Sequence, residues 1–209
     1  MNKNFSTLPA VFVATAIALA GCSAGDGSGS STSAPGMDNG GHGTMASNAP
    51  TAGAEHNSAD VMFAQMMIPH HAQAVEMSDM MLAKTGLPAA ITELATKIKD
   101  AQAPEIQMMT VWLQSWNETV PTTTGGSMTG HAMEGMMSAE DMDKLGAAQG
   151  SDAAKLFLTR MIAHHEGAIV MAKTEMDNGK NTEALALSKA IVEAQEAEIK
   201  EMQALLAGL

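Results

Sequence analysis

Cysteine, aromatic residues and basic residues are all scarce in this chain, and each scarcity excludes a class of protein. The 209 residues include one cysteine, no tyrosine, two tryptophans and four phenylalanines. A single thiol leaves neither a disulfide framework nor a thiolate metal site. Eleven lysines and arginines stand against 23 aspartates and glutamates, giving a formal net charge of −12. We therefore expect no nucleic-acid partner.

Long apolar runs are also lacking, and the one run near the start predicts export. Residues 10–20 are mostly apolar and follow Lys3. The run is too short for a stable membrane span, so residues 1–21 are predicted to be a signal peptide. It ends in Leu-Ala-Gly-Cys22, which resembles the bacterial lipoprotein signal. This resemblance implies acylation of Cys22 and a lipid anchor on the extracytoplasmic side of the membrane, in the periplasm or at the cell surface. The alternative is a plain signal peptide followed by a chance cysteine.

Methionine, in contrast, is abundant, with 20 residues. A core of Met, Leu, Ile and Ala suits helices better than sheets. Residues 22–57 are rich in Gly, Ser and Pro and predict a flexible tether, whereas residues 58–209 predict a folded helical domain. The histidines and methionines of the tether are read as incidental or as weak collecting ligands; they are Met37, His42, Met45 and His56.

One stretch of the sequence occurs twice, and a repeat constrains the architecture. Residues 63–77 read FAQMMIPHHAQAVEM and residues 157–171 read FLTRMIAHHEGAIVM, with seven of fifteen positions identical. Residues 98–109 match residues 191–202 at six of twelve positions. Each copy therefore predicts a helical hairpin whose apolar stripe is buried when the two hairpins pair.

Periodicity and helix-end signals predict an all-α fold, a four-helix bundle with pseudo-two-fold symmetry. The first hairpin covers residues 58–118 and the second covers residues 151–209. The segment 119–150 between them predicts a methionine-rich crossover with a short helix at 138–148. The long helices are expected at about residues 58–84, 88–117, 151–177 and 182–206.

Several single residues support these helix limits. Ser58 is expected to cap the first helix and Gly86 to stop it, while Pro88 opens the second helix at a favoured position. Pro69 and Pro104 lie inside the predicted helices, where each removes one backbone hydrogen bond and favours a bend.

The first helix of each hairpin carries histidine and methionine on one inward sector. At about 100° per residue, Met67, His70 and Met77 share this sector, whereas His71 lies about a quarter-turn away, at its edge. Taken singly, a methionine such as Met77 is better explained by packing. Two histidine pairs at equivalent sites exceed what packing requires. The candidate metal ligands are His70, His71, His164, His165, Met67, Met77, Met161 and Met171.

The second helix of each hairpin carries Gln and Glu on its inward stripe, at Gln102, Glu105, Gln195 and Glu198. A buried carboxylate without a partner is costly, so we expect it to pair with a histidine of the facing helix. Such a contact fixes the histidine tautomer, or the carboxylate ligates directly.

The crossover offers an auxiliary set of soft donors within a glycine-rich segment. Exposed methionines in a loop have no packing role, so an extended run of this kind favours metal binding; a hydrophobic lid over the bundle is the alternative. The residues concerned are Met128, His131, Met133, Met136 and Met137, with Met142 just beyond.

Thioethers and imidazoles together favour a soft ion. Thioether sulfur selects Cu(I) and, by the same softness, Ag(I), while imidazole accepts several transition metals. Zinc is disfavoured because methionine is a poor ligand for it. A di-iron carboxylate bundle requires Glu-x-x-His on two helices, and no glutamate stands three residues before any of the four candidate histidines.

The phrases MIPHHAQAVEM and MIAHHEGAIVM, each followed by a helix with AQ-x-x-EI-x-x-M, resemble the bacterial domain-of-unknown-function family 305. The resemblance covers about residues 58–209. It implies an exported protein with a ferritin-like four-helix fold, and an association with copper binding and copper tolerance in some members. It carries over to the four histidines and to Met67, Met77, Met161 and Met171. The second copy departs from the first at Ala163, which stands where the first has Pro69.

These observations predict a copper-binding protein of the cell envelope, with Cu(I) as the favoured ion and Ag(I) or another transition metal as alternatives. We expect sequestration or tolerance rather than enzymatic turnover. A metal-dependent redox enzyme and a structural bundle with incidental metal affinity remain the competing hypotheses. A second copy of the chain and a copper-donating or copper-accepting protein are the protein partners left open.

Overall fold

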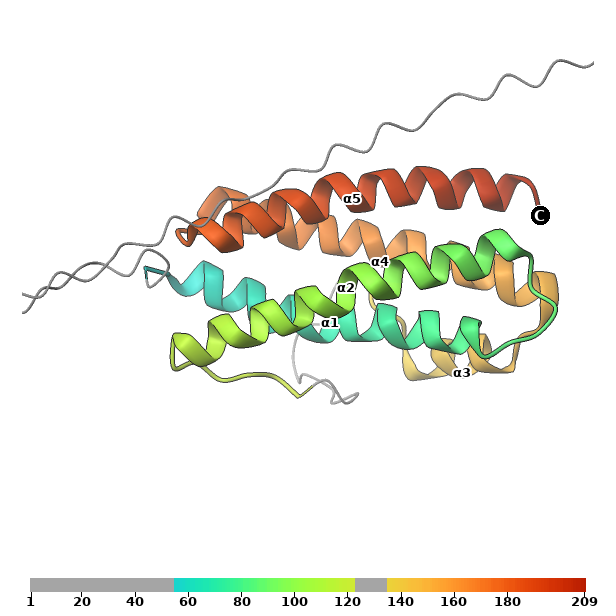
Figure 1. The fold of residues 1–209 in the computed structure, drawn as a ribbon, viewed down its shortest axis with the longest axis horizontal. Helices are drawn as coiled ribbons and strands as arrows, with labels where there is room; N and C mark the ends of the chain where they lie inside the picture. The colour runs from blue at the N-terminus through green and yellow to red at the C-terminus, as the bar shows by residue number, and fades with distance from the viewer. Residues whose placement is uncertain (1–54, 123–134) are drawn as a thin grey trace, which may run out of the picture. The chain divides into compact units, whose positions relative to one another are not determined.

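The computed structural model describes residues 55–122 and 135–209, which form five α-helices and no strand (Figure 1). The predicted all-α class is confirmed. The predicted signal peptide, Cys22, Met128, His131 and Met133 lie outside the described residues. No helix in the described part of the chain is both long enough and apolar enough to cross a membrane. The helices are α1 Ser58–Leu82, α2 Ala89–Ser115, α3 Ala139–Ala147, α4 Gly150–Asn178 and α5 Thr182–Ala207.

Helix α1 begins one residue earlier than the predicted cap implied. Asn57, not Ser58, is the N-cap: its side chain accepts hydrogen bonds from the backbone N–H groups of Ala59 and Asp60. Asp60 completes a capping box by accepting the backbone N–H of Asn57 at 2.6 Å. Ser58 could not have formed this box, because the third residue after it is Val61 rather than an acidic or amide residue.

Both interior prolines are accommodated within helices, as predicted. Pro69 lies inside α1 and Pro104 inside α2. Helix α1 ends at Leu82, and Gly86 lies in the following turn with a φ of +74°. This left-handed backbone conformation favours glycine and explains its place in the loop.

The four long helices pack as two hairpins. Helix α1 packs on α2, α4 packs on α5, and the two hairpins meet mainly through α1 and α4 (Figure 1). The Asn57 side-chain amide donates to the Asn178 carbonyl at 2.9 Å, so the start of α1 lies beside the end of α4 and the two helices run antiparallel. The bundle predicted from the repeat is therefore confirmed.

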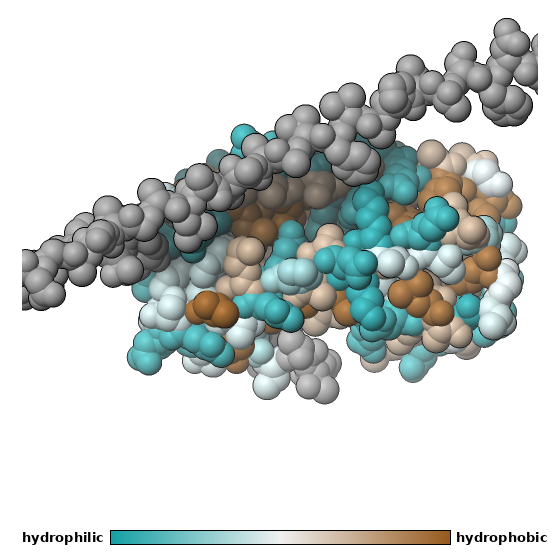
Figure 2. Space-filling model, in the orientation of Figure 1, coloured by the Kyte–Doolittle hydropathy of each residue, from teal (hydrophilic) through white to brown (hydrophobic). Residues whose placement is uncertain are grey.

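Two apolar clusters form the core. One contains Met77, Phe157 and Met161, together with Met142 and Leu145 of α3. The other contains Phe63 and Met67, with contributions from α2, α4 and α5. Figure 2 shows one face on which hydrophobic and hydrophilic residues are interspersed. The large apolar side chains that are exposed in the described part are Met62, Leu82, Met108, Val111, Val170, Met176 and Leu209.

The crossover returns to the bundle at Gly135, close to the middle of α4. Gly135 has a φ of +83°, and a side chain there would collide with the Ala163 carbonyl oxygen and approach the Cα of His164. Just beyond, the Gln73 side chain accepts the backbone N–H of Met137 at 2.7 Å and donates to its carbonyl at 2.9 Å. Gln73, which the sequence did not single out, thus fixes the end of the crossover onto α1.

Replacing Gln73 with alanine is expected to destabilise the domain by about 1–3 kcal/mol, because both polar groups of the Met137 peptide lose their partner. Urea unfolding measures the loss, and hydrogen exchange at Met137 locates it. Gln65 is the matched control, since its side chain makes one exposed hydrogen bond, to the Thr119 carbonyl. An equal loss in Gln65→Ala would contradict the role assigned to Gln73.

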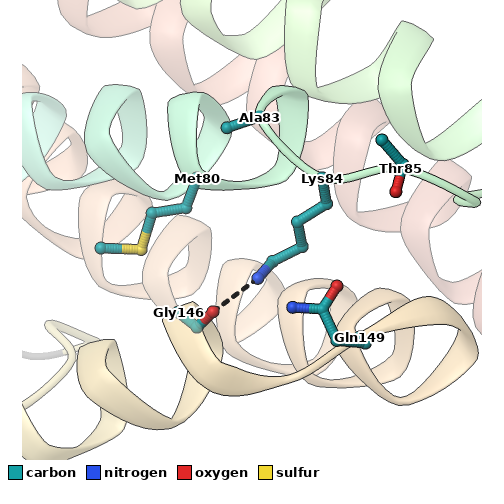
Figure 3. A pocket seen from close by; sticks show the side chains of 6 residues that line it. All are labelled: Met80, Ala83, Lys84, Thr85, Gly146 and Gln149. Carbon is teal, nitrogen blue, oxygen red and sulfur yellow. Dashed lines mark hydrogen bonds between the residues drawn. The ribbon is translucent and has the colours of Figure 1, made fainter.

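The turn that follows the C-terminal end of α1 is hydrogen-bonded to the C-terminal end of α3. The Lys84 ammonium donates to the carbonyls of Gly146 and Ala148, at 2.7 and 2.9 Å. Beside it lies an open pocket of about 390 Å³, lined by Met80, Ala83, Lys84, Thr85, Gly146 and Gln149 (Figure 3). No histidine lines this pocket, so it is separate from the candidate metal ligands.

Two buried carboxyl groups lie where α1 begins and α4 ends. Asp60 accepts backbone N–H groups of Lys180 and Asn181, at 3.0 and 2.8 Å. Burial by itself would raise the pKa of Asp60, but the interaction with Glu175 and the backbone donors outweigh it and lower that pKa. Glu175 is 1% exposed. Burial first, and then the adjacent Asp60, raise the pKa of Glu175 to about 8.

Glu175 is therefore expected to make the domain lose stability as the pH rises. Its folded pKa of about 8 lies above the ordinary value of 4.5, so between these values the folded chain binds more protons than the unfolded chain. The loss should be on the order of 1 kcal/mol or more between about pH 6 and pH 9. Denaturant unfolding at both pH values should show this loss in the natural chain and little of it in Glu175→Gln. The control is the exposed Glu76→Gln. If the stability of Glu175→Gln fell with rising pH as much as that of the natural chain and of this control, the assignment would be contradicted.

Candidate metal centre

The four candidate histidines form a buried polar layer across the middle of the bundle. His70 and His71 belong to α1, His164 and His165 belong to α4, and none of the four is exposed to solvent. The flanking methionines belong to the two apolar clusters, with Met67 in one and Met161 in the other. Imidazole groups, which prefer water or a polar partner, are thus enclosed by apolar side chains.

The two hairpins bring one histidine each into direct contact. The ring centroids of His70 and His164 lie 3.7 Å apart, with 39° between the ring planes. These residues occupy equivalent positions in the repeat, so the contact marks the place where the two copies meet. The rings of His164 and His165 lie further apart, with centroids at 6.5 Å.

The other two histidines each face a glutamate of their own hairpin. The Nε2 atom of His71 lies 2.7 Å from Glu105 Oε2, and the Nε2 atom of His165 lies 2.8 Å from Glu198 Oε2. The predicted pairing of histidine with glutamate is confirmed. The helical angle placed His71 and His165 at the edge of the inward sector, yet both are fully buried, because that edge faces the second helix of the same hairpin.

These contacts determine which ring nitrogen is left for a ligand. An ionised carboxylate only accepts hydrogen bonds, so Nε2 carries the proton and donates it. The Nδ1 atom then has a lone pair. Nδ1 of His71 and Nδ1 of His165 are both buried and make no hydrogen bond within the described residues. A histidine whose one nitrogen is fixed by a carboxylate and whose other nitrogen has no partner is typical of a metal ligand.

His164 is held neutral by its surroundings. Burial is the main reason that its pKa lies well below the ordinary value of 6.5, and the nearby His70, His165 and His71 lower it further. A neutral imidazole keeps a lone pair for a metal, whereas an imidazolium does not. Both ring nitrogens of His164 are buried and make no hydrogen bond of ordinary geometry within the described residues.

Two glutamines add further buried polar atoms next to the histidine layer. Gln102 is 2% exposed and Gln195 is 3% exposed. Neither Gln102 side-chain polar atom, nor Oε1 of Gln195, has a hydrogen-bond partner in the described part of the chain. Each lies one helical turn before the glutamate that contacts a histidine. Buried polar atoms without partners cost free energy, so their repetition in both hairpins indicates selection for something other than stability.

The candidate methionines differ in how far their side chains are buried. Met67, Met77 and Met161 are fully buried, whereas Met171 is half-buried. In the crossover, Met137 is buried in the same cluster as Met77 and Met161, and Met136 is half-buried. Whether these thioethers ligate remains a prediction, because their burial is also explained by packing.

In the described part of the chain, histidine, cysteine and carboxylate side chains by themselves do not form a metal site. Within residues 55–122 and 135–209, no three side chains of His, Cys, Asp or Glu are arranged so that they could hold one metal ion. The candidate ligands of this layer therefore include methionine sulfur as well as imidazole nitrogen. Such a mixed set suits Cu(I) or Ag(I) and is a poor match for zinc.

His56 has a different environment from the one expected of a residue in the tether. Its ring stacks on Trp116, with centroids 4.6 Å apart and 9° between the planes. Glu55 is also engaged, since its carbonyl accepts from the Asn181 side chain at 3.2 Å. These contacts place the last residues of the predicted tether against the end of the bundle.

The sequence and the fold both match known proteins. The family model for the domain of unknown function DUF305 matches residues 60–206. A DUF305 protein from Streptomyces coelicolor, provisionally described as secreted, is 36% identical with a TM-score of 0.65, and the match covers 72% of this chain and 93% of that one. A DUF305 fragment from Deinococcus radiodurans is 29% identical with a TM-score of 0.65, covering 73% and 98%.

A third relative has been solved with metal ions. CopM in its Cu(II)-bound form is 32% identical with a TM-score of 0.62, and the match covers 71% of this chain and 96% of CopM. CopM structures in Cu(I)-bound, Ag-bound and apo forms also match. No protein of curated function matches the chain. Because the DUF305 match spans most of the sequence and both helical hairpins, the chain belongs to the DUF305 family.

Proposed function

We propose that this protein binds copper, as Cu(I), in its buried histidine layer and sequesters the ion outside the cytoplasm. The observation that carries the proposal is the pair of His–Glu contacts, which leave Nδ1 of His71 and Nδ1 of His165 buried without a hydrogen bond. The Cu(I)-, Cu(II)- and Ag-bound forms of CopM support it. Methionine sulfur beside the layer favours Cu(I) over Cu(II) and allows Ag(I) as a surrogate.

The proposed activity is binding without turnover. The four histidine side chains are fully buried among apolar residues, which suits retention of an ion better than rapid exchange of a substrate. Neutral thioethers carry no proton and do not form disulfides, so they suit an oxidising compartment. Repeated oxidation of Cu(I) by the purified domain, lost on metal removal, would instead favour the redox enzyme.

Competition for Cu(I) against a chromogenic chelator tests the proposal. The domain is expected to hold Cu(I) with a Kd well below about 1 µM. A variant with all four histidines replaced by leucine should lose this affinity while remaining helical by circular dichroism. A Kd at or above about 1 µM in the natural domain, or equal affinity in the variant, would overturn the proposal.

We further propose that the protein is anchored through an acylated Cys22, which would keep the bound ion at the membrane. The lipoprotein-like segment before Cys22 supports this proposal. In a bacterial host, the natural chain should fractionate with membranes and Cys22→Ala should be released or retained as an unprocessed precursor. Identical fractionation and identical mass of the two mature chains would contradict the anchor.

A further inference from the structure

The two His–Glu pairs are matched in geometry but differ in their access to solvent. Both histidine side chains are fully buried, yet the Glu105 side chain is 22% exposed and the Glu198 side chain is 6% exposed. The donor–acceptor distances differ by only 0.1 Å, being 2.7 and 2.8 Å. The hairpins therefore place similar ligands in a common layer while opening only one pair toward the surface.

A lysine of the first hairpin lies beside the second pair. The Nζ atom of Lys97 lies 3.8 Å from Glu198 Oε1 and 2.8 Å from Glu201 Oε2. The Lys97 side chain is 52% exposed, so its ammonium lies on the solvent side of the His165–Glu198 pair. A positive charge at this point repels an approaching cation.

The residues that correspond to Lys97 and Glu201 in the other copy have different chemistry. In the alignment of the two copies, Ala190 of α5 corresponds to Lys97 and Met108 of α2 corresponds to Glu201. The side chain of Ala190 carries no charge. Met108 stands three residues after Glu105, and residues at this spacing lie next to each other on a helix surface. Met108 is 45% exposed, so its thioether is accessible to an ion in solution.

We propose that soft metal ions reach the histidine layer through the first hairpin, with Met108 as the outermost donor and the His71–Glu105 pair next. Lys97 keeps the His165–Glu198 pair closed to direct access, so the second pair is filled from within the layer. The inference rests on the proposed copper-binding function and adds to it a route and an order.

The step is a ligand exchange without redox chemistry. Cu(I) or Ag(I) keeps its oxidation state, and the thioether sulfur of Met108 forms a bond as a water molecule or a carrier's ligand leaves. A thioether loses no proton on binding, and it selects soft ions over Mg²⁺ or Ca²⁺. Glu105 attracts the cation by charge, while its contact with Nε2 of His71 leaves Nδ1 of that ring available.

Stopped-flow transfer of Cu(I) from a bicinchoninate complex to the domain tests the route. Met108→Leu preserves side-chain size and removes the sulfur; it should slow transfer by about tenfold while leaving the final stoichiometry unchanged. Met176→Leu is the matched control, because Met176 is 43% exposed on α4. Equal rates in Met108→Leu and the natural chain, or equal slowing in the control, would overturn the route.

The order of filling is tested by titrating Ag(I), below one equivalent, into the domain labelled with ¹⁵N in its histidines. The ring signals of His71 should change before those of His165, and Lys97→Ala should reduce or remove this difference. Earlier change at His165, or simultaneous change in the natural chain, would overturn the proposal while leaving metal binding intact. If neither the natural chain nor any variant took up Cu(I) or Ag(I), the proposed function would be overturned as well.

Discussion

Replacing His70 and His164 together with leucine is expected to weaken Cu(I) binding by at least about a hundredfold, the effect of losing at least one ligand from each half of the layer. Their rings are in contact at the junction of the two hairpins, so the double substitution removes the place where both copies meet. Leucine is apolar and needs no hydrogen-bond partner, so the domain should stay folded with equal or greater stability. Chelator competition measures the affinity and urea unfolding measures the stability.

His56→Leu is the control for this double variant, since His56 stacks on Trp116 at the end of the bundle. It should leave the affinity for Cu(I) unchanged. If the double variant unfolds, its affinity is uninformative, and His164→Asn, which keeps a polar group at one of the two positions, provides the decisive comparison. A folded double or single variant with natural affinity would show that copper is held elsewhere.

Acidification is expected to remove the contribution of His164 to the stability of the metal-free domain. The pKa of His164 lies well below its ordinary value of 6.5 in the folded chain, and it returns to about that value on unfolding. Below this value the unfolded chain therefore binds more protons, and stability that is fully present above about pH 6.5 is lost as the pH falls. The contribution lost approaches about 1.4 kcal/mol per pH unit while His164 stays neutral in the folded chain.

Urea unfolding of the metal-free domain between about pH 7.5 and pH 5 measures this slope. His164→Leu removes one such group, so its slope should be smaller by up to one proton. The exposed carboxylate variant Glu76→Gln is the control and should keep the natural slope. Equal slopes in His164→Leu and the natural chain would mean that His164 takes up a proton as easily folded as unfolded.

The two helical hairpins could be predicted because their signals are local and occur twice. Amphipathic periodicity, the Pro88 start and the glycine near the first turn all depend on neighbouring residues, and the periodicity recurs in the second copy. The N-cap of α1 is Asn57, one residue before the predicted Ser58. Asn57 and Ser58 are both good caps, and Asp60 decides between them, since it stands three residues after Asn57 and completes the box.

The presence of His–Glu pairs could be predicted, but not which histidines would form them. A helical wheel gives the angle of a side chain about its own axis and not the identity of the helix found at that angle. His70 and His71 point about 100° apart, so one meets α4 and the other meets α2. The sequence pattern placed one histidine of each pair at the edge of the inward sector, and this edge histidine is the one with the carboxylate partner.

Features that occur once could not be predicted. Gln73 holds the Met137 peptide only because the crossover returns there, and the repeat has Gly167 at the corresponding position. The carboxyl groups of Asp60 and Glu175 meet because the start of α1 lies beside the end of α4. In both cases the residues are far apart in the sequence, and no periodic signal links them.

Copper X-ray absorption of the Cu(I)-loaded domain tests most directly whether imidazole and thioether bind one ion inside the bundle. The account predicts a mixed shell of nitrogen and sulfur, with the nitrogen contribution lost in the folded variant lacking His70 and His164. A shell of nitrogen and oxygen alone, or a spectrum unchanged by that double substitution, would contradict it.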